Sequence, residues 1–496
     1  MRYLSTRDKS IRCTAAEAIV QGISPDGGLY VPEVLASLAE RQISSMCQMT
    51  YRQRAVYIMG AFLKDFTTAE LTQFADRAYR EEKFDTPEIA PIKKLTDDIW
   101  FLELWHGPTA AFKDMALQML PHLLTASLVK AGEEKEVCIL VATSGDTGGA
   151  ALEGFCDVPR TKIVAFYPKD GISEIQRLQM VTRSGSNVGA LGVVGNFDDT
   201  QAGVKRIFAD AGLNEELLER GYFLSSANSI NWGRLLPQIV YYVSAYCDLV
   251  QTGRIAVGEQ VNVAVPTGNF GNILAAYYAK QMGLPLGTLI CASNENDVLT
   301  EFFHTGVYNR NRPFHLTLSP SMDILVSSNL ERLLFALSGG NDRETRAYMS
   351  SLAKTGRYTV TPRMKREMDQ IFWAGSCGDQ KTKRVIGTAH KTFGYLMDPH
   401  TAVAFDVLLN YRQATGDKKP AIVVSTANPY KFADSVLEAL GESYEERGLA
   451  LLERLSTVSR VRPPAALLAL SGKRCRFGRS IDVGDMPRAV REFVAR

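Results

Sequence analysis

The sequence lacks the features of a membrane-embedded, secreted or nucleic-acid-binding protein. Its apolar runs have the length of strands, as at residues 421–424, and none is long enough to span a bilayer. The first ten residues alternate in charge and have no apolar core, so we expect no secretory signal. The 56 basic and 54 acidic residues give a net charge of +2 and are interleaved, without blocks of one sign. We therefore expect neither a nucleic-acid nor a membrane partner.

Metal and nucleotide signatures are missing as well. The eight cysteines are scattered, with no Cys-x-x-Cys pair and no histidines at metal spacing. This pattern predicts no metal site, and reduced, mostly buried thiols in a cytoplasmic protein. No Gly-x-x-x-x-Gly-Lys-Ser/Thr segment occurs, and the glycine turn at residues 267–272 does not match Gly-x-Gly-x-x-Gly. Internal repeats and low-complexity tracts are also lacking.

What the chain does contain is a regular alternation of strands and helices. Residues 137–142 form a continuous apolar run, typical of a strand buried on both faces, and a glycine turn and a helix follow it. Residues 261–265 repeat this pattern before a helix at 271–282. Such alternation implies right-handed crossovers and mostly parallel sheets. The fold class that we predict is α/β, with two doubly wound, mostly parallel sheet domains.

The 496 residues, 46% of them apolar, are enough for two or three domains with sizeable cores. We expect an N-terminal mixed subdomain at 1–95 and a first α/β domain at 96–250. A second α/β domain at 251–455 would contain a helical insertion at about 311–390, and a tail at 456–496 would end the chain.

Two glycine-rich turns follow predicted strands and begin predicted helices. In Thr-Gly-Asn-Phe-Gly-Asn (267–272), the free N–H groups at a helix start would bind phosphate, and the glycines would let the backbone approach it. In Ser-Gly-Asp-Thr-Gly-Gly (144–149), the side chains of Ser144, Asp146 and Thr147 would suit a carboxylate or phosphate. Taken alone, each loop is equally consistent with an ordinary capped turn.

Lys113 lies in His-Gly-Pro-Thr-Ala-Ala-Phe-Lys-Asp (106–114), about thirty residues before the turn at 144–149. A lone lysine is usually solvated. Desolvation beside Phe112 would lower its pKa, as a reactive amine requires. One amine and two anion-binding loops are what a phosphate-bearing aldehyde needs, so the combination predicts pyridoxal 5'-phosphate. Upstream, His106 fits a structural histidine better than a base.

Two further polar clusters follow predicted strands. Residues 225–234 carry amides and hydroxyls that are costly to bury without partners, and Arg234 could reach back one helical turn to a planar anion. A capped helix start with a surface arginine is the alternative. In Ser-Thr-Ala-Asn-Pro-Tyr-Lys-Phe (425–432), a hydroxyl could bond a neutral pyridine nitrogen, or the segment could simply cap a helix before Pro429.

Together these segments resemble the threonine synthase family, whose members are fold-type II pyridoxal-phosphate enzymes. The resemblance extends over nearly the whole chain, and although each motif is weak alone, their order is highly specific. The motifs are those quoted at 106–114, 226–234 and 425–429, with Asp-Gly-Gly-Leu-Tyr-Val-Pro-Glu (26–33), Ala-Thr-Ser-Gly-Asp-Thr-Gly (142–148), Pro-Thr-Gly-Asn-Phe-Gly-Asn (266–272), Ser-Met-Asp-Ile-Leu-Val-Ser-Ser-Asn (321–329) and Asp-Pro-His-Thr-Ala-Val (398–403).

The resemblance implies a fold like that of the tryptophan synthase β chain. It also implies conversion of O-phospho-L-homoserine and water to L-threonine and phosphate. By it, Lys113 would hold the cofactor and carry protons, and Thr426 would face the pyridine nitrogen. The cofactor phosphate would lie on Gly268, Asn269, Phe270, Gly271 and Asn272. The substrate would contact Ser144, Gly145, Asp146, Thr147, Asn228, Ser229 and Arg234, with Thr147 and the last three residues on its phosphate. The expected partner is this small molecule alone, and the expected state is a monomer or weak homo-oligomer.

Several alternatives remain open at this point. A phospho-lyase of the same fold, giving 2-oxobutyrate, would need the same residues. A serine or threonine dehydratase fits less well, because Arg234 would then have no phosphate to bind. An inactive relative would not need an intact Lys113. Many fold-type II relatives carry Asn where this chain has Asp146, so the partner of the cofactor's ring hydroxyl also stays open.

Overall fold

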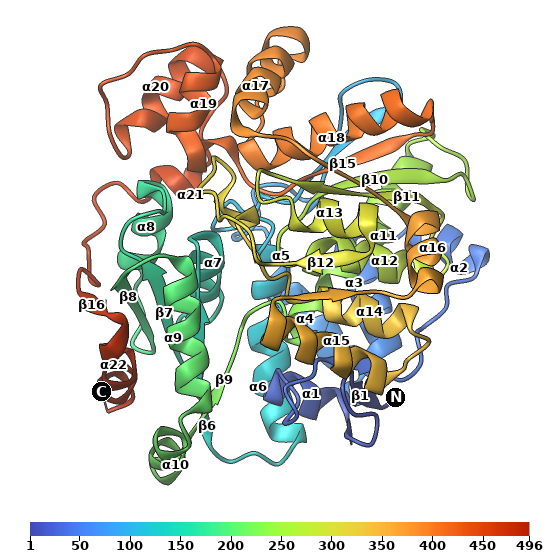
Figure 1. Ribbon diagram of the computed structural model, residues 1–496. Helices are drawn as coiled ribbons and strands as arrows, with labels where there is room; N and C mark the ends of the chain where they lie inside the picture. Colours follow the sequence, from blue (N-terminus) through green and yellow to red (C-terminus); the bar gives the residue numbers. More distant parts are fainter. Residues whose placement is uncertain (496) are drawn as a thin grey trace.

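The computed structural model describes residues 1–495, and residue 198 by its backbone only. Two open sheets form its framework, with the five-stranded sheet to the left in Figure 1 and the six-stranded sheet to the upper right. Both sheets are mainly parallel and carry helices on both faces. The expected α/β fold class is thereby confirmed.

The five-stranded sheet is parallel throughout. Its strands, in spatial order, are β16 (Ser480–Asp482), β8 (Val188–Val194), β7 (Thr161–Pro168), β6 (Glu136–Ala142) and β9 (Tyr222–Ser225). The helices beside it are α7 (Asp146–Gly154), α8 (Glu174–Val181), α9 (Phe197–Ala209), α10 (Ala211–Glu219) and α22 (Met486–Val494). The apolar run predicted at 137–142 is the buried strand β6.

The six-stranded sheet is parallel except for one edge strand. Its order is β14 (Phe372–Ser376), β11 (Leu286–Ser293), β10 (Val261–Pro266), β15 (Ala421–Ser425), β5 (Ile99–Glu103) and the antiparallel β4 (Ile92–Lys94). In Figure 1, helix α18 (Pro399–Thr415) lies above this sheet. Below it lie α11 (Trp232–Gln251), α12 (Gly271–Gln281) and α13 (Val298–Thr305).

The N-terminal residues pack against the second sheet's helices. Three short antiparallel strands form a small sheet: β1 (Tyr3–Ser5), β2 (Arg12–Cys13) and β3 (Tyr30–Pro32). The helices here are α1 (Ala15–Gln21), α2 (Glu40–Met46), α3 (Tyr51–Phe62) and α4 (Thr68–Ala78). Trp232 of α11 is fully buried and contacts the rings of Tyr3, Phe62 and Tyr278. These aromatic contacts join the N-terminal region to the core.

The remaining elements are short or lie outside the sheets. They are α5 (Asp114–Leu117), α6 (Leu120–Lys130), the ribbon of β12 (Val307–Asn309) and β13 (Arg357–Thr359), α14 (Leu330–Leu337), α15 (Asp342–Thr355), α16 (Pro362–Ile371), α17 (Asp379–Phe393), α19 (Ala433–Ala439), α20 (Ala450–Ser459), α21 (Ala465–Leu468), and the 3-10 turns η1 (Pro320–Met322), η2 (Pro429–Phe432) and η3 (Val483–Asp485).

Besides the edge strand β4, whose residues belong to the expected N-terminal subdomain, three strands of the two large sheets lie where the expected division of the chain did not put them. Strand β5 pairs with β15 in the six-stranded sheet, although 96–250 was expected to build the other one. Strand β14 lies within the segment expected to be a helical insertion and pairs with β11. Strand β16, from the expected tail, forms the edge of the five-stranded sheet. Each strand finds a partner far away in the sequence, which local pattern does not specify.

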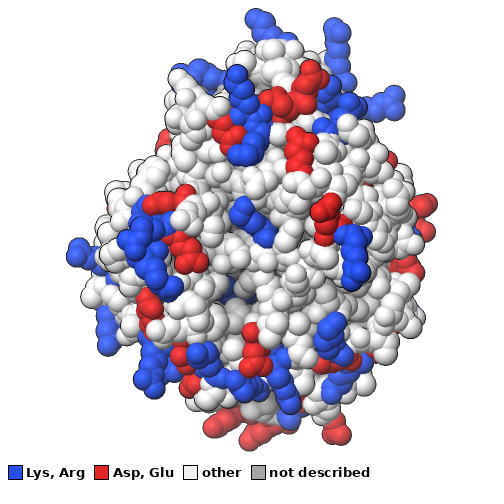
Figure 2. Space-filling model, turned by 90° about the vertical axis from the view of Figure 1, so that its right-hand side faces the viewer, with Lys and Arg blue, Asp and Glu red and all other residues white. Residues whose placement is uncertain are grey.

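The surface and the cysteines agree with the composition. Over most of the face shown in Figure 2, basic and acidic side chains are interspersed. All eight cysteines are free thiols, six of them buried. Between residues 1 and 495, no helix is both long enough and apolar enough to cross a membrane, and no group of side chains could hold a metal ion.

Candidate active site

A cavity of about 810 Å³ lies where the two sheets face each other. Its walls include segments that follow the carboxyl ends of β6, β10 and β15, together with α9 and the loop before α11. In open parallel sheets, ligands bind at this edge because the connecting loops gather there. Of the predicted site residues, twelve line the cavity: Lys113, Ser144, Thr147, Asn228, Ser229, Arg234, Gly268, Asn269, Phe270, Gly271, Asn272 and Thr426.

The loop before α12 has the geometry of an anion cradle. Phe270 adopts the left-handed conformation, with φ at +67°, and turns the chain into the helix. A Cβ atom on Gly268 would lie 2.6 Å from the carbonyl oxygen of Ser321, so only glycine fits there. Asn272 accepts hydrogen bonds from two buried tyrosines, Tyr241 and Tyr242, through its Oδ1. Its buried Nδ2 has no partner among the described residues, which leaves a donor for a ligand.

Lys113 is buried in the cavity wall, close to a carboxylate. Its Nζ donates to Ser321 Oγ at 3.2 Å and lies 3.7 Å from Asp146 Oδ2. Burial lowers the pKa of this amine to about 8, with Asp146 opposing the shift and Arg234 and Lys431 adding to it. A large fraction of Lys113 is therefore neutral near pH 8, as a nucleophile must be.

The turn after β6 divides its residues between the cavity and the interior. Ser144 and Thr147 line the cavity, whereas Gly145 and Asp146 lie behind the lining. Thr143 Oγ1 accepts the N–H groups of Gly145 and Gly148, so these two backbone donors are not available to a ligand. The turn therefore offers a ligand the side-chain hydroxyls of Ser144 and Thr147 more than its backbone N–H groups.

Asp146 is buried in a network of its own. Its Oδ1 accepts from Lys431 Nζ at 2.8 Å and from Gln176 Nε2 at 2.9 Å. Its Oδ2 accepts from Ser321 Oγ at 3.3 Å. Burial opposes ionisation, but Lys431 and Lys113 outweigh it and hold the pKa of the Asp146 carboxyl well below its usual range. Asp146 is thus a permanent anion beneath Lys113.

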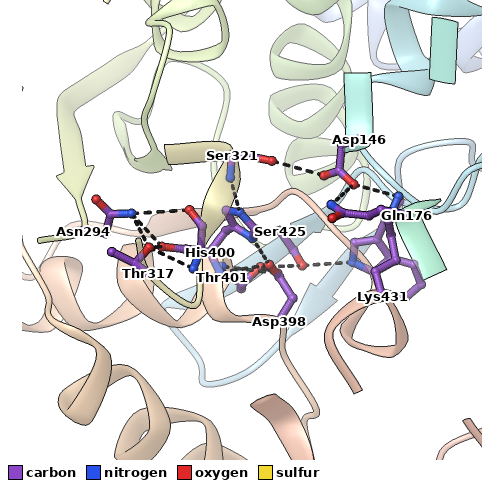
Figure 3. Close-up of polar contacts among 12 residues, drawn as sticks. Asp146, Gln176, Asn294, Thr317, Ser321, Asp398, His400, Thr401, Ser425 and Lys431 are labelled. Atoms are coloured by element: carbon purple, nitrogen blue, oxygen red, sulfur yellow. Dashed lines mark hydrogen bonds and ion pairs between the residues drawn. The ribbon is translucent and has the colours of Figure 1, made fainter. Parts of the chain in front are cut away.

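A second chain of contacts reaches Ser321 from α18. The backbone N–H of Ser321 donates to His400 Nε2 at 3.2 Å, so that nitrogen carries no proton. His400 Nδ1 then donates to Asp398 at 2.7 Å. Figure 3 shows the continuous path from Lys431 through Asp146 and Ser321 to His400 and Asp398.

The loop before α11 carries a second set of groups without partners. Asn228 Oδ1 and Arg234 Nε are buried and have no hydrogen-bond partner among the described residues. Among the residues that the structure describes, Arg234 donates to the carbonyl oxygen of Ala227 alone, and burial lowers its pKa to about 10. Ser229 Oγ accepts from Asn329 Nδ2 at 2.9 Å. A buried cation with spare donors fits an anionic ligand.

Two other predicted residues have clear surroundings. Thr426 is buried at the end of β15, and its carbonyl oxygen accepts the N–H of Phe112, next to Lys113. His106 lies between two carboxylates, with Nδ1 2.5 Å from Asp85 and Nε2 3.0 Å from Glu103. Because His106 does not line the cavity, the structure supports a structural role for it.

Sequence reasoning missed Ser321, His400, Lys431 and Gln176 as site residues. The first three lie inside segments already noted for their motifs, at 321–329, 398–403 and 425–432. Each of these three is a polar side chain inside a motif segment, and that placement is the signal that could have identified it. Gln176 belongs to an ordinary amphipathic helix, and no local signal distinguishes it.

The lining fits pyridoxal phosphate. An amine with a lowered pKa is available at Lys113, and the phosphate loop offers close backbone approach at Gly268 and a free amide donor at Asn272. Thr426 offers a neutral hydroxyl at the end of β15. These are the groups that would hold the aldehyde, phosphate and ring of the cofactor.

Family models match most of the chain. The model for "Threonine synthase N terminus" matches residues 2–79, that for "Pyridoxal-phosphate dependent enzyme" matches 84–364, and that for "Threonine synthase, C-terminal" matches 401–471. The chain is 39% identical to the threonine synthase of Pseudomonas aeruginosa, over 88% of this chain and 90% of that protein. It is 42% identical to "Threonine synthase-like 1" of Homo sapiens, over 86% of this chain but only 58% of the human protein's length.

Solved structures agree. The pyridoxal-phosphate-bound threonine synthase of Brucella melitensis superposes with a TM-score of 0.87 at 34% identity, and each chain is covered fully. Threonine synthase from yeast gives a TM-score of 0.87 at 32% identity, over 100% of this chain and 99% of that one. The chain therefore belongs to the threonine synthase family of pyridoxal-phosphate-dependent enzymes.

Proposed function

We propose that this protein is a threonine synthase, converting O-phospho-L-homoserine and water to L-threonine and phosphate. The observation that carries the proposal is one cavity lined by Lys113 and by two separate sets of unpaired polar groups. The set around Asn272 would take the cofactor phosphate. The set around Arg234 would take the phosphate of the substrate, and Asn228 would bind it through its amide N–H groups, because its unpaired Oδ1 is an acceptor. A cofactor with one phosphate and a substrate with another require two such sets.

Lys113 would carry the proton transfers. When bound, pyridoxal phosphate supplies an electron-accepting ring that stabilises the charge left when the substrate's Cα loses its proton. Lys113 would hold the cofactor and, once released, take and return protons at the substrate's Cα and Cβ. A pKa of about 8 suits both directions, because the amine is then neither fully protonated nor fully neutral near neutral pH.

The polar groups of the substrate side would act on the leaving group. Arg234 would neutralise charge on the departing phosphate, and the hydroxyls of Thr147 and Ser229 would orient it. Ser144 lies beside Thr147 in the cavity lining and would contact the substrate's amino-acid end. Gly145 and Asp146 lie behind that lining, so we assign them support of the loop and not direct contact with the substrate.

A product assay tests the function. The purified chain with added pyridoxal phosphate and O-phospho-L-homoserine should release phosphate and threonine in equal amounts. Phosphate matched by 2-oxobutyrate would instead identify a phospho-lyase with the same site. No phosphate release would contradict both activities. Lys113→Ala, lacking the amine, is the control and should abolish turnover of either kind.

The eight free thiols support a reducing compartment, and we propose the cytoplasm. Mass measurement of the protein isolated from its cells, with thiols blocked at lysis in denaturant so that the six buried cysteines also react, would check this. All eight cysteines should carry the blocking group.

A further inference from the structure

Asp146 offers its two carboxylate oxygens to two different lysines. Oδ1 lies 2.8 Å from Lys431 Nζ, and Oδ2 lies 3.7 Å from Lys113 Nζ. The side chain of Asp146 is 2% exposed and that of Lys431 is 0% exposed, so water does not screen either charge. Lys431 comes from η2, just after β15, and Asp146 opens α7 in the other sheet's layer. The pair, shown in Figure 3, therefore joins the layers of the two large sheets, and Lys113 lies 3.7 Å from its carboxylate.

Lys431 has no donor left for a ligand. An ammonium group has three N–H bonds. Those of Lys431 are directed to Asp146 Oδ1, to the carbonyl oxygen of Thr109 at 2.8 Å, and to Gln179 Oε1 at 2.9 Å. It is also absent from the residues that line the cavity. Lys431 thus acts on the site without touching a ligand: its charge lowers the pKa of Lys113, and of its contacts Asp146 is the one that reaches Lys113.

Helix α8 holds the side chain of Lys431 in place. Gln179 of this helix accepts from Lys431 and donates to the same Thr109 carbonyl at 2.9 Å. Gln176, one turn earlier, donates to Asp146 Oδ1. Residues i and i+3 lie on one helix face. One face of α8 therefore supports both members of the ion pair.

The charges around Lys113 explain why such a pair is needed. A buried carboxylate with Lys113 as its only cation would hold that amine protonated, since separating the charges in a low-dielectric site is costly. A protonated amine can neither bond to an aldehyde nor accept a proton. With Lys431 beside it, the carboxylate is already neutralised. The other charged group close to Lys113 is Arg234 of α11, a cation, and His400 of α18 contacts Ser321 through its unprotonated nitrogen.

We propose that Lys431 is a positioning residue of the reaction: it neutralises Asp146, so that the carboxylate orients Lys113 through Oδ2 and Ser321 without holding its proton. This inference rests on the proposed role of Lys113 as the reacting amine. It assigns Asp146 and Lys431 a joint function, in which neither charge is useful without the other.

Titration of Lys113 in the cofactor-free full chain tests the proposal. The rate at which fluorodinitrobenzene modifies Lys113 would be followed against pH by peptide mass spectrometry. Relative to the unmodified sequence, Asp146→Asn should lower the pKa of Lys113 by about one unit or more, because an opposite charge is lost. Lys431→Gln should raise it, because Asp146 then has Lys113 as its remaining lysine partner. The value in the double variant should lie between those of the two single variants.

The Lys431→Gln protein could fail to fold, because the buried carboxylate of Asp146 is then less well neutralised. A second comparison keeps the test decisive in that case. The double variant is then compared with Asp146→Asn alone. Removal of the Lys431 charge from the Asp146→Asn protein should raise the pKa of Lys113. Equal values in these two proteins, or a Lys431→Gln protein that titrates like the unmodified one, would overturn the proposal. Lys383→Gln removes a lysine from an exposed pair with Glu438 and is the control for charge alone.

The outcome is independent of the proposed reaction. If the product assay fails while Lys113 titrates as described, the substrate assignment is wrong and the role of Lys431 stands. If threonine forms while the variants leave the Lys113 titration unchanged, the substrate assignment stands and the role of Lys431 is wrong. In an active enzyme, the acidic limb of the pH profile of kcat should shift in the same direction as the Lys113 pKa, a change that loss of packing alone would not produce.

Discussion

Arg234 is a buried cation whose main-chain contact uses one donor and leaves Nε without a partner among the described residues. If it binds the substrate phosphate, Arg234→Gln removes a charge-assisted hydrogen bond worth about 1.5–3 kcal/mol, or roughly a 10- to 100-fold change in kcat/KM. Steady-state kinetics with O-phospho-L-homoserine measures it. Arg346→Gln, which removes an exposed arginine on α15, is the matched control and should leave kcat/KM unchanged. An Arg234→Gln protein with ordinary kcat/KM would exclude this phosphate site.

His106 gives a pH-dependent contribution to stability. Although burial opposes its protonation, Asp85 and Glu103 raise its pKa to about 9. The unfolded value is near 6.5, so the stabilisation is complete below about pH 6.5 and is lost as the pH rises through 9. Because Asp85 is exposed and its charge is screened by solvent, we expect protonated His106 to add about 2 kcal/mol to the free energy of unfolding.

Urea unfolding of the unmodified protein and of His106→Asn, at pH 6 and pH 9.5, checks this expectation. The difference in unfolding free energy between the two proteins should be large at pH 6 and much smaller at pH 9.5. A difference that does not change with pH would show that His106 acts by packing and not by its charge.

At the scale of elements, the turn between β10 and α12 decides how the cofactor phosphate is held. A Cβ atom on Gly268 would lie 2.6 Å from the Ser321 carbonyl oxygen, which is backbone and cannot simply rotate away. Gly268→Ala should therefore displace η1 and with it the Ser321 hydroxyl beside Lys113. We expect cofactor affinity to fall at least about tenfold, a loss of about 1.4 kcal/mol. Equilibrium dialysis of pyridoxal phosphate measures it.

Gly339→Ala is the control for this substitution, because a Cβ there meets no atom within 4 Å and the residue follows α14, away from the cavity lining. Gly339 has a φ of +73°, so an alanine there adds backbone strain without a steric contact, which makes the control a strict one. If both variants bound the cofactor equally, close approach at Gly268 would not be what the loop requires.

The same elements show which site residues sequence could predict. The turns at 144–149 and 267–272 follow buried strands, and their glycines and polar side chains mark them locally. Ser321 and Lys431 also lie in recognisable motif segments, but the burial of Lys431 and the contact of both residues with Asp146 depend on the approach of two sheets. Local pattern identifies a loop that can hold an anion; it does not identify the lysine that balances a carboxylate from another element.

For the whole molecule, strand-helix alternation predicted the α/β class and the central strands β6 and β10, but not the partners of β5, β14 and β16. A short strand such as β16 pairs with β8 across almost 300 residues of sequence, and its three residues carry no periodic signal. What decides its place is the adjoining α22. This helix buries Met486, Ala489 and Val490 against α9, and a Cβ on Gly203 of α9 would lie 2.3 Å from Met486 Sδ.

The end of the chain therefore supports the cavity through α9. One face of α9 packs on α22, while its residues Gln201, Val204 and Phe208 line the cavity. Met486→Ala should lower the unfolding free energy by about 2–5 kcal/mol, as deletion of a fully buried methionine side chain does. Because α9 then loses its support, the KM for substrate should rise as well. Urea unfolding and steady-state kinetics measure the two effects, and Arg488→Ala, exposed on the same helix, should change neither. A stability loss with an unchanged KM would mean that α9 keeps its place without α22, and that the C-terminal helix serves the fold alone.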